Sequence, residues 1–411
     1  MDPTVHQSGA SGQGISSTAR KVGLGFGATL HSSIEAIPRE VWDGMLPGDP
    51  ESYEFYRAVE PIPPPGFRLG AISVSQGDRI LAVAPTFEVD YRLDTPLQGG
   101  LRRITNWIHA RVPGLMSLSV IGIGSPMSDN CTVGFLRALD AAERASVFAT
   151  MLDRLKQEAR ARHISLLAVK GLGGLACEVA QTLGDHGYLR ATTVPLAMLP
   201  MQFTTFDAWL DSLPKKERIY FRKKLKSAAD VRIEYRTTIK GLESQIAALS
   251  EATLAQSKVD YGDFDKVHAG YFSNVVDRLG EGMQMMLCWK GDELISFQLC
   301  LLGRDRIINQ KLGMKYPEAR EYNLFFLNWL MLVRYAIENG VGLIEMGATT
   351  YATKLLFGGY LERRWLYFRC RWRIATAVMR PFLRLADFER NDPELMKLNA
   401  IVHEQGETTL L

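Results

Sequence analysis

The sequence predicts an α/β (α+β) protein that contains one structural unit twice. Three pairs of similar segments support this, and they follow one another in the same order. The pairs are SQGDRILAVAP (75–85) with WKGDELISFQL (289–299), ARARHISLLAVKG (159–171) with AIENGVGLIEMGA (336–348), and HGYLRATTVPLAML (186–199) with GGYLERRWLYFRCR (358–371). We therefore predict two tandem domains, each a mixed β-sheet flanked by helices.

Each pair of segments predicts particular elements. The first has a Gly-Asp turn between two apolar or alternating runs, which is typical of a β-hairpin. The second joins the end of a long helix to an apolar strand through a polar or glycine-containing break. The third starts with a Gly-Tyr-Leu turn and continues with strand-forming residues. The repeated unit is thus a hairpin, a helix, a strand, a turn and a strand.

The two long helices can be tested separately by their apolar spacing. In 143–162, Val147, Met151 and Leu155 recur every four residues and form one apolar stripe. In 323–339 apolar residues surround almost the whole helix, so we expect it to be buried between layers. Gly340 follows directly and is suited to cap its C-terminus.

The domain boundaries follow from the repeat and from composition. A chain of 411 residues is longer than one compact core usually holds. We predict a disordered Gly- and Ser-rich tail at 1–34, an N-terminal domain at 35–200, a C-terminal domain carrying the chemistry at 201–375, and a helical tail at 376–411. The first copy also carries a long additional loop, 91–130, between its hairpin and its helix.

Composition excludes several classes of protein. The net charge is only +3, so any affinity for polyanions must be local. The five cysteines are scattered and never spaced as C-x-x-C, which argues against a disulfide framework and a structural metal site. No secretion signal or apolar run of roughly 20 residues stands out, so we expect a cytoplasmic protein with no membrane span.

Three stretches, together with the order of elements, resemble a known family. They are PREVWDGMLPGDPESYEFYRAVE (38–60), LPKKERIYFRKKLKSA (213–228) and EYNLFFLNWLMLVRYAIENGVGLIEMGATTYATKLLFGG (321–359). The chain is similar over about residues 35–375 to GNAT superfamily N-acyltransferases of the CelD/BcsL type, which are tandem, FemAB-like proteins. The resemblance implies two GNAT folds in tandem and transfer of an acyl or aminoacyl group to an amine.

The third stretch resembles the signature region of that family. An acidic residue precedes a glycine, and a Tyr and a Lys follow before Phe-Gly; here these are Glu345, Gly347, Tyr351, Lys354, Phe357 and Gly358. The family more often has Asp at the acidic position, and Tyr directly before the Lys, where this sequence has Thr353. The resemblance implies catalytic roles for Glu345, Lys354 and Tyr351, and a place for Gly347 in substrate binding.

Amide formation needs a group that accepts the amine's proton and a donor that stabilises the oxyanion. Glu345, at the end of an apolar strand, could accept that proton or orient the amine, or could merely cap a neighbouring loop. Lys354 could bind a phosphate, a carboxylate or the oxyanion, or be a surface lysine. No G-x-S-x-G motif is present, and the reaction requires no covalent enzyme intermediate.

The donor side is less well defined. GNAT proteins usually hold the CoA pyrophosphate on a glycine-rich loop, and the corresponding loop, 313–323, has a single glycine. Tyr322 and Asn323 open the following helix and could donate hydrogen bonds to substrate, or serve only as caps.

A basic run lies between the two predicted domains. Arg218, Arg222 and Lys226 are spaced i, i+4, i+8 and share one helix face. This face could steer an anionic donor, or it could simply be solvated.

The leading hypothesis is an N-acyltransferase that moves an acyl group from a thioester donor to a small-molecule amine. The donor would be acyl-CoA or an acidic acyl-carrier protein, used as a co-substrate without a tightly bound cofactor. One alternative is a FemAB-type transferase that uses aminoacyl-tRNA, which would make nucleic acid a partner. The other is a non-catalytic binding or scaffold protein that has kept the fold.

Overall fold

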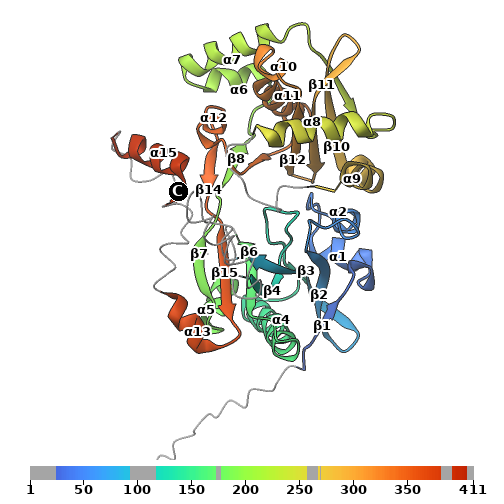
Figure 1. The fold of residues 1–411 in the computed structure, drawn as a ribbon, viewed down its shortest axis with the longest axis vertical. Helices are drawn as coiled ribbons and strands as arrows, with labels where there is room; N and C mark the ends of the chain where they lie inside the picture. The colour runs from blue at the N-terminus through green and yellow to red at the C-terminus, as the bar shows by residue number, and fades with distance from the viewer. Residues whose placement is uncertain are drawn as a thin grey trace, which may run out of the picture.

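The protein folds into two mixed β-sheets that lie one above the other along its long axis (Figure 1). The computed structural model describes residues 25–92, 117–172, 177–256, 267–268, 270–380 and 391–404. Within those residues, no helix is both long enough and apolar enough to cross a membrane.

The first sheet is built mainly from the N-terminal half. Its strands, in order of neighbours, are β1 (Gly27–His31), β2 (Arg68–Gln76), β3 (Arg79–Arg92), β4 (Ser117–Ile123), β6 (Leu166–Leu172), β15 (Trp365–Cys370) and β7 (Leu189–Thr192), while β5 (Gly134–Phe135) pairs with β3. The pair β4 and β6 is parallel, and the remaining pairs are antiparallel.

The second sheet repeats this order. Its strands are β9 (Arg232–Arg236), β10 (Met283–Lys290), β11 (Glu293–Leu302), β12 (Arg306–Met314), β13 (Leu343–Gly347), β8 (Leu196–Pro200) and β14 (Tyr360–Glu362). Here the parallel pair is β12 and β13, at the same place in the order as β4 and β6. The predicted fold class, two tandem domains with mixed sheets, is confirmed.

The two halves exchange one strand each. β8 leaves the N-terminal half and pairs with β13 and β14 of the second sheet. β15 returns from the C-terminal half and pairs with β6 and β7 of the first sheet. In Figure 1 the orange-red β15 accordingly lies among green strands. The domain limits 35–200 and 201–375 remain a prediction, and residues near each limit contribute to the other sheet.

The repeated segments form the predicted elements. Both hairpins turn at a Gly-Asp pair, with Gly77 at φ 58° and Gly291 at φ 57°, a backbone conformation that glycine adopts without strain. The two long helices are α4 (Ala141–Ala161) and α11 (Leu324–Glu338), and each connects the two parallel strands of its own sheet. Gly340, at φ 65°, ends α11 as predicted.

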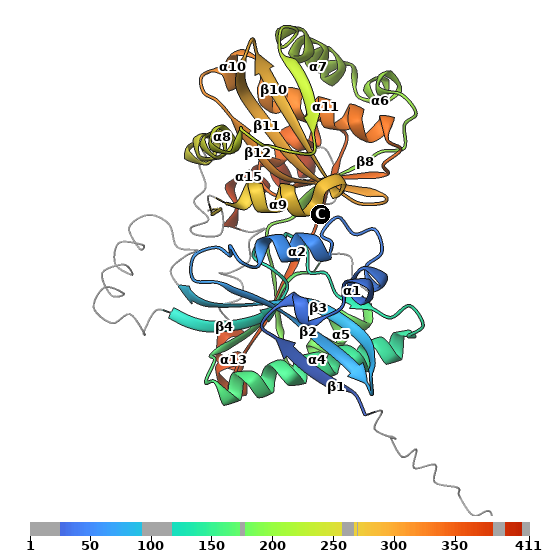
Figure 2. The ribbon, with the colours of Figure 1, turned by 90° about the vertical axis from the view of Figure 1, so that its right-hand side faces the viewer.

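Shorter helices cover the sheets and join the halves. They are η1 (Ile34–Ala36), α1 (Arg39–Met45), α2 (Tyr53–Val59), α5 (Cys177–Asp185), α6 (Phe206–Ser212), α7 (Lys215–Ser227), α8 (Glu243–Ala255), α9 (Tyr271–Leu279), η4 (Gly280–Gly282), α10 (Glu318–Glu321), α12 (Tyr351–Leu355), α13 (Arg373–Met379) and α15 (Pro393–Glu404). One apolar cluster contains Trp42 and Phe55 of the first half together with Tyr271 and Phe272 of the second. Figure 2 shows α2 against α9 where the halves meet.

Two expectations for local structure were wrong. The additional loop 91–130 contains strand β4, whose residues Val120 to Ile123 pair with β6. The tail 1–34 contains strand β1, which pairs with β2 along its whole length. β1 (GATLH) has few strand-forming residues and depends on its pairing with β2, whereas β4 (SLSVIGI) is rich in Val and Ile, so its strand signal is local. Residues 1–24 and 93–116 lie outside the described residues.

Candidate active site

Strand β13 separates from β12 at the centre of the second sheet. The parallel pairing joins Arg306–Ile308 to Leu343–Glu345, and β12 then continues to Met314 paired with β11. Glu345 is therefore at the last paired position, where the two strands diverge. Divergence of parallel strands opens space inside a sheet without breaking its remaining hydrogen bonds.

Glu345 is held by residues from both halves of the chain. Its side chain is 1% exposed. Asn130 Nδ2 donates to both carboxylate oxygens, at 3.0 and 3.1 Å, and Arg306 Nη1 lies 3.5 Å from Oε2. The Asn130 amide is oriented in turn by Arg364, whose Nη2 donates to its Oδ1 at 3.0 Å. Burial raises the pKa of Glu345, while Arg306 and Asn130 oppose that rise.

A second buried carboxyl adjoins this group. Glu51 is 1% exposed, and its pKa is raised well above the ordinary value by burial and by the nearby Asp49, which also receives a hydrogen bond from Arg306 at 3.2 Å. Ser128 Oγ lies 2.6 Å from Glu51 Oε2 and 2.8 Å from the Asn130 carbonyl oxygen. The hydroxyl has one hydrogen for two acceptors, so a protonated Glu51 satisfies both contacts.

The turn after β13 is strained. Gly347, Thr349 and Thr350 have φ values of 76°, 65° and 49°. Positive φ is costly for β-branched residues, and such strain concentrates at functional sites. Lys354 fixes this turn, because its Nζ donates to the carbonyl oxygens of Gly347, at 3.0 Å, and Ala348, at 2.6 Å.

Lys354 is itself in an unusual environment for a lysine. It is 4% exposed, and its Nζ lies 5.8 Å from the ring centroid of Trp329 on α11. Burial lowers the pKa of Lys354 to about 7, and the exposed carboxylate of Asp129 opposes this shift. Tyr351 is 1% exposed and starts the same short helix. The structure thus brings together four predicted residues, Glu345, Gly347, Tyr351 and Lys354.

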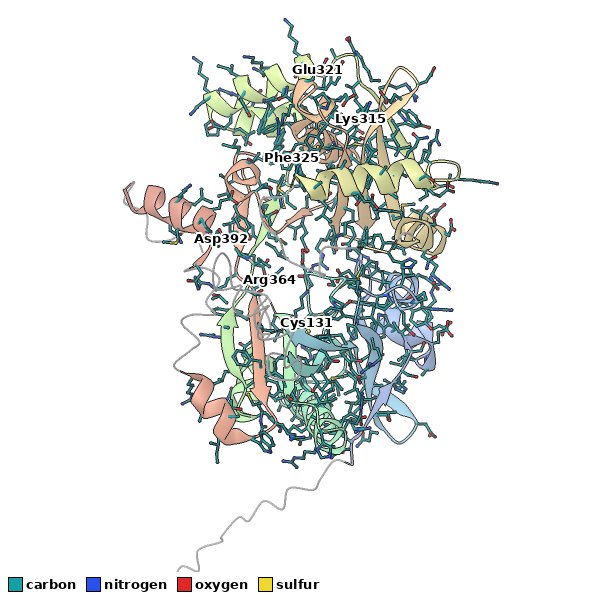
Figure 3. The ribbon with its side chains drawn as sticks, in the orientation of Figure 1. Cys131, Lys315, Glu321, Phe325, Arg364 and Asp392 are labelled. Carbon is teal, nitrogen blue, oxygen red and sulfur yellow. The ribbon has the colours of Figure 1, made fainter. Side chains whose placement is uncertain are left out.

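The other predicted residues lie apart from this group. Figure 3 shows Arg364 where the halves meet and Glu321, which directly precedes Tyr322, at the outer end of the second half. The Tyr322 ring lies 4.9 Å from Lys290 Nζ. Asn323 contacts α7: its Oδ1 accepts from Lys224, and its Nδ2 donates to Ser227 Oγ at 2.9 Å.

The basic run forms α7, but the predicted three-residue face is divided. The side chains of Arg218 and Arg222 both approach Asp211 Oδ1, at 3.5 Å. The Arg218 side chain is half-buried, whereas Arg222 and Lys226 are exposed. The solvent-facing side of α7 therefore includes Arg222 and Lys226 but not Arg218.

Sequence reasoning missed the residues that the first half supplies. The loop SPMSDNC (125–131) directly follows β4 and provides Ser128, Asp129 and Asn130. Partly buried Lys170 holds this loop by donating to the carbonyl oxygens of Ser125 at 3.1 Å and Ser128 at 2.5 Å. The sequence signal for these residues is a run of polar side chains at the end of an apolar strand, within the segment predicted to be an additional loop.

Comparisons with known proteins agree with this architecture. Residues 215–355 match the family model described as an acetyltransferase (GNAT) domain. The chain is similar to a crystal structure of FemX, with a TM-score of 0.54, 13% identity, and coverage of 80% of this chain and 96% of that one. A comparison with curated proteins gives no match.

Two further solved structures are similar to this chain. A C-terminal DUF2156 domain from Agrobacterium fabrum has a TM-score of 0.50 and 11% identity, with 84% of this chain and 93% of that chain covered. A tandem GNAT protein from the clavulanic acid biosynthesis pathway has a TM-score of 0.46 and 12% identity, with 84% and 99% covered.

The family match and the repeated sheet order define the class of protein. Residues 215–355 match a GNAT acetyltransferase domain, and the described residues form two sheets of the same strand order in tandem. The resemblance inferred from the sequence is confirmed.

Proposed function

We propose that this protein is an N-acyltransferase that moves an acyl group from a thioester to an amine at the end of β13. The observation that supports this most strongly is the buried Glu345 where β13 separates from β12, beside a strained turn that Lys354 holds. A raised carboxyl pKa and a lowered lysine pKa bring both groups closer to neutral pH, where proton transfer is most efficient.

The proposed reaction needs no covalent enzyme intermediate. The amine nitrogen attacks the thioester carbonyl carbon, and Glu345 accepts the proton that the nitrogen loses. Lys354 donates to the oxyanion that forms on the carbonyl oxygen. The carbon–sulfur bond then breaks, and Tyr351 supplies the proton that the leaving thiolate takes up. Asn130 and Arg364 act through Glu345 by fixing its orientation.

The donor would bind along the second sheet. We assign substrate contacts to Gly347 at the turn and to Tyr322 and Asn323 at the start of α11. A helix start offers unpaired backbone N–H groups and a partial positive charge, which suit the phosphates of a CoA or phosphopantetheine arm. Arg218, Arg222 and Lys226 of α7 would add electrostatic attraction for the same donor.

The test is amine-dependent release of thiol from acyl-CoA donors of increasing chain length, measured against a panel of amines. We expect Glu345→Gln to reduce turnover by about 10²–10⁴-fold, because the amide keeps the shape but cannot accept a proton. The control is Glu293→Gln, which alters an exposed carboxylate paired with Lys315 on the surface.

Three outcomes would change the proposal. Full activity in Glu345→Gln would remove Glu345 from the mechanism. Activity with aminoacyl-tRNA but not with thioesters would favour the FemAB-type alternative. Turnover of neither donor class, with folded protein, would favour the scaffold alternative.

A further inference from the structure

The outward face of α7 has an apolar centre and a basic surround. Ile219 is 57% exposed, which is unusual for a large aliphatic side chain on a helix. Helical residues are about 100° apart, so every residue within roughly 60° of Ile219 on this face is a cation. These exposed cations are Lys215, Lys216, Arg222, Lys223 and Lys226.

This face carries little compensating negative charge. Glu217, the acidic residue of the helix, points to the opposite side and has a buried carboxylate oxygen. Asp211 pairs with Arg218 and Arg222 at one edge. Among the described residues no ion pair involves the four lysines of the face. Unpaired surface charge of one sign attracts a partner of the opposite sign.

The rest of the helix is firmly anchored. Phe221 is fully buried and packs on Phe357, with ring centroids 4.6 Å apart, and on Trp209, at 6.0 Å. Lys224 points inward, with its Nζ 4.8 Å from the Tyr220 ring centroid and 4.9 Å from that of Phe326. Lys224 therefore helps to hold α7 against α11, whereas the exposed lysines make no such contact among the described residues.

The inner side of α7, opposite the basic face, contacts the start of α11. Lys224 and Ser227 contact Asn323, which immediately precedes α11. Figure 1 shows α7 near α11. Trp329, which lies against Lys354, is six residues further along, or roughly 9 Å at 1.5 Å per helical residue. A donor held on α7 could therefore extend a flexible arm along the start of α11 toward Lys354.

We propose that this face of α7 docks an acidic carrier protein that presents the donor as a thioester on its phosphopantetheine arm. The inference rests on the proposed acyl transfer and names the donor's carrier. A protein surface with an acidic rim around an apolar spot complements both features of the face. A phosphate backbone would use the cations but not Ile219, and a membrane surface would need a broader apolar face.

The test measures binding of a fluorescently labelled, purified bacterial acyl-carrier protein to the full chain by anisotropy. We expect Lys216→Glu with Lys223→Glu to weaken binding by about tenfold or more, since each reversal places like charges at the interface. Ile219→Ser should weaken it several-fold. The matched control is Lys240→Glu, at an exposed lysine outside α7 that should bind as wild type does.

Binding is measured without turnover, so this test is independent of the acyl-CoA assay. Binding by Lys216→Glu/Lys223→Glu that is as tight as the binding by wild type and by Lys240→Glu would overturn the proposal. So would binding of tRNA or of anionic vesicles that the α7 reversals abolish and Ile219→Ser leaves intact, because a non-protein partner would then occupy the face. Circular dichroism of each variant checks that loss of binding is not loss of fold.

Discussion

At the scale of single residues, the site depends on ionisable groups that burial has shifted. Glu345 and Glu51 have raised pKa values, and Lys354 has a lowered one. Each shift disfavours the charged form, as removal from water does. Arg306 contacts Glu345 and Asp49, so one cation links acids of the two halves.

Glu51 should make stability depend on pH. Its folded-state pKa is raised, so the folded chain retains a proton that the unfolded chain releases above its ordinary pKa of 4.5. Its contribution is thus fully present below that pH and is lost as pH rises toward the raised value. Glu51→Gln cannot ionise, so we expect its Tm relative to wild type to increase from pH 5 to pH 8. A difference that stays constant with pH, measured by calorimetry, would contradict this.

Lys354 should set the alkaline limit of activity. Its pKa is lowered to about 7, so the charged form that can stabilise an oxyanion disappears above that pH. We expect wild-type turnover to decline as pH rises through about 7. Lys354→Met should lose roughly 10²–10³-fold in kcat, the usual effect of removing one oxyanion donor, and should lose this alkaline limb. An unchanged kcat would show that Lys354 does not stabilise the oxyanion and only holds the turn at Gly347 and Ala348.

At the scale of elements, the exchanged strands couple the halves. β15 fills the position between β6 and β7, and β8 fills the corresponding position between β13 and β14. Each sheet is therefore completed by a strand from the other half. The crossing segment before β15 contains Arg364, which contacts Asn130, so the exchange also positions the site.

Removal of β15 should destabilise the first sheet, although the deleted residues are distant in sequence. We expect a chain truncated after Glu362 to lose hydrogen-exchange protection in peptides from β6 and β7, whose edges would be unpaired. The control is truncation after Met379, which keeps β15 and removes α15. Retained protection in the shorter chain would show that β15 does not stabilise the first sheet.

At the scale of the whole molecule, the repeat could be predicted from signals within single segments. The pairing of strands between the two halves could not. The Gly-Asp hairpins and the two long helices follow from turn chemistry and apolar spacing, which act over a few residues. The strand exchange does not, because a strand's own residues do not specify which sheet it joins.

The same distinction applies to the site. Glu345, Tyr351 and Lys354 lie within one stretch of sequence and were predicted together. Asn130 is separated from Glu345 by 215 positions and from Arg364 by 234, so a single sequence gives no sign that they meet. The polar loop after β4 could be assigned a role only once the two sheets had been placed against each other.

The most direct test of this account is the pH profile of amine-dependent thiol release by Asn130→Asp, using the donor that wild type turns over. If the two halves share the active site, a carboxylate beside Glu345 raises the pKa of that base, so we expect the acid limb of kcat to move up by about one unit or more. Asn339→Asp on the surface should leave the limb in place. An acid limb identical to that of wild type would contradict an active site that the two halves share.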